Sequence, residues 1–351
     1  MTGRALVVGT GLIGGSIGFA LRRLGWHVTG RDDDHERAAR AVELGALDVA
    51  GTDPDADVAF VATPVGAIAA EARRLVSATT IVTDVGSVKA PIVAAVDHPR
   101  FVGGHPMAGS EQEGVDGAHP DLFVGATWVL TPTSSTDAAA YARVQEVVSS
   151  LGASVVAVPP DRHDALVAVV SHVPHLTAAA LMTLAAGRAE EHATVLRLAA
   201  GGFRDMTRVA AGHPGIWPDI CAENRDAIVA ALDELLARLA GVRETVAGAD
   251  RDALLSMLEA ARHARVNLPS RVAAHAEEMA EMRVPVPDRP GVLAEITTLA
   301  GELGVNIADV EIAHSAEGDR GVLLLVIDAK DADLLRGAFL ARGYRPSVRP
   351  L

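Results

Sequence analysis

The chain has 351 residues, of which 49% are hydrophobic and 22% are charged, and its formal net charge is −14. At roughly 150 residues per domain, this length predicts two or three domains with a substantial core, and the composition excludes an intrinsically disordered chain. The acidic balance argues against a nucleic-acid partner, because negative charges repel a phosphate backbone. An anionic substrate would need a local basic pocket.

Cys221 is the single cysteine, which excludes an intrachain disulfide and a zinc site built from cysteines. A reducing, cytoplasmic location is therefore expected. The most apolar stretch, residues 167–184, carries His172, Pro174 and His175, so it lacks the uninterrupted apolar run that a membrane span needs. We therefore expect no membrane-spanning segment.

The chain shows three successive patterns. Residues 1–160 alternate short β-branched runs with helix-length segments, which is typical of βαβ units around a parallel sheet. The strands expected there are residues 5–8, 27–29, 58–62, 80–83, 101–102, 127–130 and 154–158. Residues 161–280 have helical periodicity instead, at 164–187, 189–200, 216–247 and 250–265. Their high apolar content predicts burial against a second subunit.

Residues 281–351 return to short strands. The expected order is a strand at 282–286, a helix at 291–303, strands at 305–313 and 320–327, a helix at 331–342 and a strand at 344–348. This β-α-β-β-α-β order is the ferredoxin-like layout.

A glycine-rich turn lies near the start of the chain. Gly9, Gly11 and Gly14 form a GxGxxG pattern between the first expected strand and the first expected helix. In that context the turn brings a pyrophosphate to the helix N-terminus, although a glycine-rich turn without a ligand is the alternative. Asp32 follows 18 residues after Gly14, where a carboxylate accepts the ribose hydroxyls of NAD. Arg31 beside it leaves NADP open, since an arginine there can bind a 2′-phosphate.

Two further motifs follow expected strands, so they should lie at the carboxyl edge of the sheet, where open α/β sheets bind ligands. One is DVGSVK, residues 84–89, and the other is HPMAGSE, residues 105–111. Ser87 in the first motif could equally cap the next helix. His105 in the second, placed beside a cofactor, can take a proton while a hydride leaves. A purely structural histidine is the alternative.

Two motifs lie in the helical region. SHVPH, residues 171–175, puts His172 and His175 on one helical face, but no acidic or cysteine cluster accompanies them, and we expect no metal. GGFRDMTR, residues 201–208, spaces Arg204 and Arg208 four residues apart on one helical face. Both could bind carboxylates through bidentate hydrogen bonds. The alternative is a solvated face with an Arg–Asp pair.

Taken in order, the motifs GTGLIGGS, DVGSVK, HPMAGSEQEG, SHVPH and GGFRDMTR, followed by Trp217, resemble the prephenate/arogenate dehydrogenase family of tyrosine biosynthesis. The resemblance covers nearly the whole chain. Residues 286–293, VPDRPGVL, resemble the start of an ACT domain, a small amino-acid-binding regulatory module. The resemblance implies a Rossmann-type α/β domain over residues 1–160, an all-α substrate and dimerisation domain over 161–280, and a ferredoxin-like ACT domain over 281–351. It also implies a homodimer that uses NAD in preference to NADP.

The resemblance assigns a role to individual residues. His105 would be the catalytic histidine, and Ser87 would hydrogen-bond both that histidine and the substrate hydroxyl. Arg208 would bind a substrate carboxylate, and Trp217 would reach the pocket of a partner subunit. The other residues lining or gating the substrate pocket would be Ser110, Glu111, His175, Arg204 and Asp205. The residues contacting NAD would be Gly9, Gly11, Leu12, Ile13, Gly14, Asp32 and Thr63.

The implied substrate, prephenate, carries a ring hydroxyl, a ring carboxylate and a pyruvyl side chain. Hydride would pass to NAD as His105 takes the hydroxyl proton, and loss of CO2 would leave aromatic 4-hydroxyphenylpyruvate without a metal. Arogenate would give tyrosine directly, and the sequence does not separate the two substrates. A 3-hydroxy-acid dehydrogenase would leave HPMAG and the ACT-like segment unexplained. A non-enzymatic sensor of NAD or amino acids would not need His105, Ser87 and Arg208 together.

The ACT-like region also predicts an effector site. Asp288 and Gly291 lie at the turn before its first helix, where helix N–H groups can take a carboxylate and Asp288 can take an ammonium. Val292 follows Gly291 in the same turn-to-helix segment and is counted with the effector site, and the resemblance implies a further contact from Asn306. We expect tyrosine, the pathway end product, to bind between two paired modules and to inhibit. Phenylalanine, another amino acid, or a tail that serves only dimerisation are the alternatives.

Overall fold

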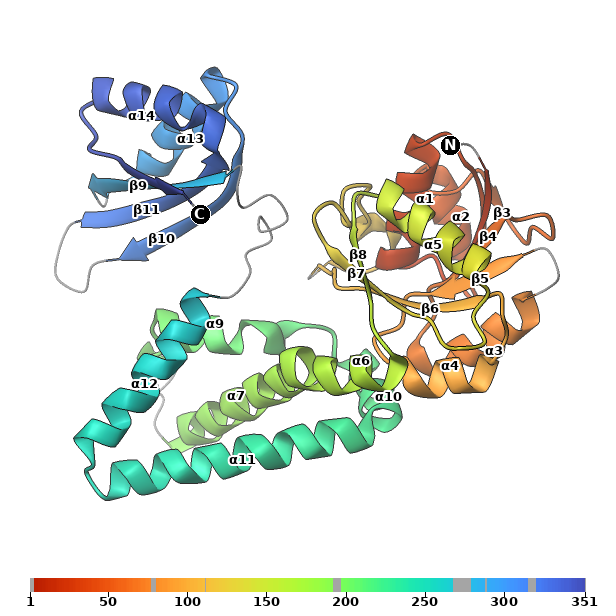
Figure 1. Cartoon of the computed structure of the whole chain (residues 1–351), viewed down its shortest axis with the longest axis horizontal. Coiled ribbons are helices and arrows are strands. Elements are labelled where there is room, and N and C mark those ends of the chain that lie inside the picture. Colours follow the sequence, from red (N-terminus) through yellow and green to blue (C-terminus); the bar gives the residue numbers. More distant parts are fainter. Residues whose placement is uncertain are drawn as a thin grey trace. The chain divides into compact units, whose positions relative to one another are not determined.

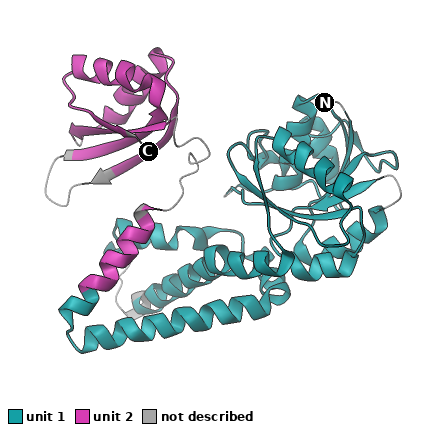
Figure 2. Cartoon of the chain, in the orientation of Figure 1, with its two compact units in different colours: residues 1–254 teal, residues 255–351 magenta. Residues whose placement is uncertain are grey.

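The structure is a computed structural model that describes residues 3–76, 80–110, 112–191, 197–267, 279–287, 289–314 and 320–350. The chain divides into two compact units, residues 1–254 and 255–351 (Figure 2). The first unit contains a large sheet domain and most of the helical region. The second contains the end of that region and a smaller sheet domain.

An eight-stranded sheet with strand order β3-β2-β1-β4-β5-β6-β7-β8 forms the first domain (Figure 1). Its strands are β1 (Arg4–Val8), β2 (His27–Arg31), β3 (Val49–Ala50), β4 (Val58–Val61), β5 (Ile81–Asp84), β6 (Phe101–Pro106), β7 (Thr127–Thr131) and β8 (Ser154–Ala157). Side chains alternate across the sheet: Ala5 and Val7 belong to one core cluster, whereas Leu6 and Val8 belong to another. Both faces of the sheet are therefore buried.

Five helices cover these two faces. They are α1 (Leu12–Arg23), α2 (His35–Glu43), α3 (Val65–Leu75), α4 (Ala90–Val96) and α5 (Ala138–Ser150). Apolar side chains of α1, α2 and α5 join the cluster of Ala5 and Val7. Those of α3 and α4 join the cluster of Leu6 and Val8. This two-layer cover is what a doubly wound sheet requires, and it confirms the Rossmann-type prediction.

The expectation of a parallel sheet is wrong at one pair of strands. Every neighbouring pair is parallel except β6 and β7, which are antiparallel. The reason lies in their connection, where the described residues contain only a short 3-10 turn, Val115–Gly117, and no crossover helix. Parallel neighbours need such a crossover and antiparallel ones do not. The two-residue strand β3 was not predicted at all.

The helical region begins directly after β8. Its elements are α6 (Pro160–Val167), a π-helical turn (Ala168–His172), α7 (Val173–Glu191), α9 (Gly201–Thr207), 3-10 turns at Arg208–Ala211 and Pro214–Ile216, α10 (Trp217–Glu223), α11 (Arg225–Ala247) and α12 (Arg251–Val266). The expected helix 216–247 is two helices that meet at Asn224. Of the expected helix 189–200, residues 189–191 belong to the end of α7 and Arg197 is helical, whereas residues 192–196 lie outside the described part.

One helical stretch, Pro160–Arg188, is long and apolar enough to cross a membrane by length and composition alone. Its first half nevertheless contains three buried polar side chains, His163, Asp164 and His172. All three are hydrogen-bonded to other parts of the protein. Such bonds are typical of a helix packed within a globular domain, so the expectation of no membrane span is retained.

The C-terminal domain is a four-stranded antiparallel sheet with order β10-β11-β9-β12. Its elements are β9 (Met279–Pro287), α13 (Val292–Glu302), β10 (Ile307–His314), β11 (Arg320–Asp328), a 3-10 turn (Ala329–Asp331), α14 (Ala332–Ala341) and β12 (Ser347–Pro350). Met282, Ile296, Leu325 and Phe339 bring strands and both helices into one core. The predicted β-α-β-β-α-β layout is confirmed.

Candidate active site

The glycine turn joins β1 to the N-terminus of α1. Gly9 has a φ of +92°, and a Cβ there would lie 2.4 Å from the carbonyl oxygen of Ala62. A Cβ on Gly14 would lie 1.9 Å from the carbonyl oxygen of Gly9, so only glycine lets the helix begin so close to the strand. A Cβ on Gly11 would meet nothing within 4 Å. The helix N-terminus thus faces open space, as a pyrophosphate site requires.

Two further groups complete this edge. Asp32, directly after β2, accepts hydrogen bonds at Oδ2 from the backbone N of Thr10 at 2.8 Å and from its Oγ1 at 3.2 Å. The carboxylate is thereby held against the glycine turn. Thr63 lies just after β4, and its buried hydroxyl has no hydrogen-bond partner among the described residues. Open space above Gly11, a carboxylate at the end of β2 and an unsatisfied hydroxyl after β4 fit a dinucleotide with an unsubstituted ribose.

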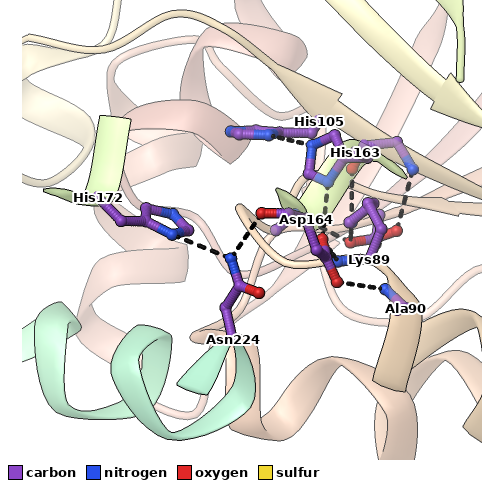
Figure 3. A network of polar contacts seen from close by, with 10 residues as sticks. Lys89, Ala90, His105, His163, Asp164, His172 and Asn224 are labelled. Carbon is purple, nitrogen blue, oxygen red and sulfur yellow. Dashed lines mark hydrogen bonds and ion pairs between the residues drawn. The ribbon is translucent and has the colours of Figure 1, made fainter. Parts of the chain in front are cut away.

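His105, near the end of β6, is the first residue of a hydrogen-bonded chain (Figure 3). Its Nδ1 lies 2.9 Å from Nε2 of His163, a buried residue of α6. Nδ1 of His163 lies 2.8 Å from Oδ1 of Asp164. A carboxylate can only accept, so His163 donates through Nδ1. When His163 carries this one ring proton, its Nε2 accepts from Nδ1 of His105, and His105 keeps its lone pair at Nε2.

This geometry prepares His105 to act as a base. Burial, together with the neighbouring His163, lowers the pKa of His105 well below its ordinary value, so the ring is neutral at physiological pH. With His163 donating to Asp164 and accepting from His105, the basic nitrogen of His105 is Nε2. A partly buried, neutral imidazole with a defined tautomer is suited to removing a proton from a hydroxyl group.

Asp164 connects the helical region to the sheet domain. Besides the bond from His163, its carboxylate accepts bonds from the backbone N of Lys89 at 2.7 Å and of Ala90 at 2.8 Å, at the start of α4. Its backbone carbonyl accepts a bond from Nδ2 of Asn224 at 3.0 Å. The same amide lies 3.2 Å from Nδ1 of His172, as Figure 3 shows. Burial lowers the pKa of His172 to about 4.

A buried ion pair supports the strand that carries His105. Lys89 Nζ contacts Asp84 Oδ2, and both side chains are fully buried. Nζ also donates to the carbonyl oxygen of Gly104 at 2.7 Å, while Asp84 Oδ1 accepts from the backbone N of Gly104 at 3.1 Å. Asp84 and Lys89, the first and last residues of the DVGSVK motif, therefore bind the backbone N–H and C=O of Gly104, the residue before His105.

The structure places the other predicted residues as follows. Ser87 is partly buried after β5, and the described partner of His105 Nδ1 is His163 and not Ser87. Ser110 is exposed, and its Oγ accepts a bond from the backbone N of Gln112 at 3.1 Å. Glu111 lies outside the described residues. In the α6–α7 region, His175 stacks on Trp217 of the same chain, with ring centroids 3.8 Å apart.

The two predicted arginines lie together but not within one continuous α-helix. Arg204 is in α9, and its Nε donates to the carbonyl oxygen of Ala199 at 3.2 Å. That helix ends at Thr207, so Arg208 begins a 3-10 turn. Both side chains and that of Asp205 are exposed, and the turn packs against α7, the helix that carries His175. The turn thus places Arg208 beside the helix that carries His175.

No prediction from the sequence included His163, Asp164, Asn224 or the structural role of Lys89. A signal existed for His163 and Asp164, since the polar sequence DRHD stands just after β8 at the start of an apolar helical stretch. Among the described residues, no group of three or more His, Cys, Asp or Glu side chains is placed to hold a metal.

Comparisons with known protein families match three models to this chain. They are "Prephenate dehydrogenase, nucleotide-binding domain" over residues 17–157, "Prephenate dehydrogenase, dimerization domain" over 159–260, and "ACT domain" over 282–341. A prephenate dehydrogenase from Bacillus subtilis is 34% identical over 343 residues, covering 93% of this chain and 92% of that protein. A cyclohexadienyl dehydrogenase from Zymomonas mobilis is 32% identical, covering 75% of this chain and 94% of that protein.

Solved structures agree with these matches. A prephenate dehydrogenase from Aquifex aeolicus, in complex with hydroxyphenyl propionate and NAD+, superposes with a TM-score of 0.71 at 32% identity. The superposition covers 75% of this chain and 97% of the Aquifex aeolicus chain. An arogenate dehydrogenase from Synechocystis superposes with a TM-score of 0.65 at 34% identity, covering 75% of this chain and 98% of its own.

Two glycine variants separate binding from folding at the cofactor turn. We expect Gly14→Ala to lower the free energy of unfolding by about 1–3 kcal/mol, because its Cβ has no room beside Gly9. Gly11→Ala should fold normally but lose NAD affinity, because its Cβ enters the open space above the helix N-terminus. Thermal melting and equilibrium NAD binding measure the two effects. Equal destabilisation by both substitutions would contradict this assignment.

Proposed function

The chain belongs to the prephenate dehydrogenase family, and from that premise we propose that it oxidises prephenate with NAD to 4-hydroxyphenylpyruvate and CO2, with His105 as the general base. NAD, when bound, accepts the hydride. The observation that carries the proposal is the chain of bonds from Asp164 through His163 to His105. This chain supports a tautomer of His105 in which Nε2 takes the hydroxyl proton of the substrate.

His163 and Asp164 act as positioning residues. They touch neither substrate nor cofactor in this proposal, but they set the tautomer and the ring orientation of His105. When His105 takes the proton, its Nδ1–H remains bonded to His163, and the Asp164 carboxylate stabilises the positive charge that develops. Ser87 is proposed as the residue that orients the substrate hydroxyl from the neighbouring strand end.

The anionic groups of the substrate need cations in an acidic protein. We propose that Arg208 binds a carboxylate of the substrate, and that Arg204 and His175 line the same pocket. Ser110, Glu111, Asp205 and Trp217 complete the proposed pocket. Arginine presents paired N–H donors that match a carboxylate. Arogenate is the second candidate substrate, supported by the likeness to the Synechocystis enzyme; steady-state kinetics with both substrates in parallel decide between them.

We propose that the helical region forms a homodimer interface in a cytoplasmic protein. Among the described residues of α7, α11 and α12, six large apolar side chains are more than half exposed in the single chain: Leu184, Leu236, Leu239, Val246, Leu255 and Leu258. An apolar cavity of about 490 Å³ lies among α7, α9 and α11, lined by residues such as Leu181, Met206 and Leu235. A second copy that covers these surfaces is more consistent with the buried polar groups of α6 than a membrane would be.

We also propose that the ACT domain binds tyrosine and inhibits the enzyme. Gly291 has a φ of +88° and opens the eleven-residue helix α13, whose first N–H groups can receive a carboxylate. Asn306, exposed just before β10, is the further contact. Val292 is buried in the core of the domain, so only its backbone can take part. Asp288, proposed for the ammonium group, lies outside the described residues.

Replacing the base should stop turnover without unfolding the protein. We expect His105→Asn to bind NAD normally and to lower kcat by about 100- to 10,000-fold, the usual contribution of general base catalysis. In the unmodified enzyme only the neutral ring can accept a proton, and its pKa is lowered. The kcat/KM profile should therefore stay level as the pH falls through about 6.5 and decline only below it. Turnover of His105→Asn close to that of the wild type would remove His105 from the mechanism.

Removing Arg208, the residue proposed to bind a substrate carboxylate, should weaken substrate binding. We expect Arg208→Ala to raise KM by about 10- to 150-fold, because a hydrogen bond to a charged group contributes roughly 1.5–3 kcal/mol. Arg225→Ala, an exposed arginine of the same region that bonds Asp226, is the matched control and should leave KM unchanged. Unchanged substrate affinity with weaker NAD binding would instead place Arg208 in the cofactor site.

Tyrosine inhibition should depend on the C-terminal domain. We expect tyrosine to inhibit the full chain and not a shortened chain that ends before β9, and substrate to weaken tyrosine binding by linkage. In the full chain, Asn306→Ala should lower tyrosine sensitivity without changing uninhibited activity. Activity against tyrosine concentration measures both effects. If full and shortened chains are inhibited equally, tyrosine competes at the active site and the ACT domain is not the sensor.

A further inference from the structure

An ion pair lies beside the cofactor turn and takes no part in the chemistry described above. Arg31, the last residue of β2, contacts Oε2 of Glu71 in α3 through Nη2. The side chains of Arg31 and Glu71 are 27% and 12% exposed, so the pair is largely shielded from water. The second oxygen of Glu71, Oε1, accepts a bond from Nη1 of Arg74 at 2.5 Å. Both oxygens of the Glu71 carboxylate thus have arginine partners.

The position of Arg31 makes this pair relevant to the cofactor. Arg31 pairs with Val8 across the parallel strands, and its carbonyl oxygen accepts a bond from the backbone N of Gly9 at 2.8 Å. Its chain neighbour Asp32 is the carboxylate held against the glycine turn. Arg31 therefore stands where an arginine can bind the 2′-phosphate that distinguishes NADP from NAD.

We propose that Glu71 is a cofactor-specificity residue: it retains the Arg31 guanidinium, so that only Asp32 meets the 2′ position of the nucleotide. An arginine committed to a shielded carboxylate is not available to a phosphate. A 2′-phosphate would then face the carboxylate of Asp32 without a compensating cation. The free hydroxyl of NAD instead donates a hydrogen bond to it. This inference rests on the dinucleotide site and is independent of the aromatic substrate.

The test is equilibrium binding of NAD+ and NADP+ to the full chain, measured by titration calorimetry without substrate. Glu71→Gln keeps the size of the side chain but removes its charge. We expect its NADP+ affinity to rise by about tenfold or more, the effect of one charge-assisted hydrogen bond gained. Its NAD+ affinity should stay within about twofold, which also shows that the variant is folded. An unchanged NADP+ to NAD+ affinity ratio would overturn the proposal.

Three further variants distinguish this role from a purely structural link between β2 and α3. Arg74→Gln removes the other arginine of Glu71 and should leave the affinity ratio unchanged. Glu71→Gln combined with Arg31→Gln should lose the gain in NADP+ affinity, whereas a gain that persists would show that Arg31 is not responsible. Arg31→Gln alone should not weaken NADP+ binding, and a loss there would overturn the proposal even if Glu71→Gln fails to fold. Failure to oxidise prephenate would leave these binding results unaffected.

Discussion

The buried carboxylate of Asp164 is the constraint on which the proposed active site depends. It accepts hydrogen bonds from the ring of His163 and from two backbone N–H groups at the start of α4. A buried carboxylate is costly unless such donors surround it, and here they come from both the sheet domain and the helical region. The hydrogen bonds from the start of α4 to this carboxylate therefore hold α6 against α4. This arrangement also brings His163 within hydrogen-bond distance of His105.

A second buried charge acts on the other side of His105. The pair of Lys89 and Asp84 binds both backbone groups of Gly104, so β6 is held at the residue before the base. Removing either partner would leave an uncompensated charge in the core, which is far more damaging than loss of a surface ion pair. The two networks meet at Lys89, whose backbone N also donates to Asp164. The protein's own groups thus position strand and ring together, which is how a site avoids reorganisation during the reaction.

Charge is used differently at the other end of the cofactor site. The protein carries a formal charge of −14. Near the dinucleotide turn, however, the carboxylates of Asp32 and Glu71 each have their own hydrogen-bond or ion-pair partner. Asp32 accepts bonds from Thr10, and Glu71 holds Arg31. The local pattern, and not the net charge, decides which nucleotide fits, because a phosphate interacts most strongly with the few groups within a few ångströms of it.

The sequence by itself determined the succession of a Rossmann-type sheet, a helical region and a ferredoxin-like sheet, and it indicated the glycine turn and His105 as candidates, because each depends on local spacing: strand periodicity, a GxGxxG turn and a motif at a strand end. It did not reveal that β6 and β7 are antiparallel, since an apolar run has the same pattern in either direction. Nor did it reveal His163 beside His105, 58 residues apart, or Glu71 on Arg31, 40 residues apart. Those contacts exist only once α6 docks on α4 and α3 packs beside the sheet. The tertiary structure alone therefore decided the hydrogen-bond partner of His105 and the partner of Arg31, because a hydrogen bond requires two groups to meet within about 3 Å.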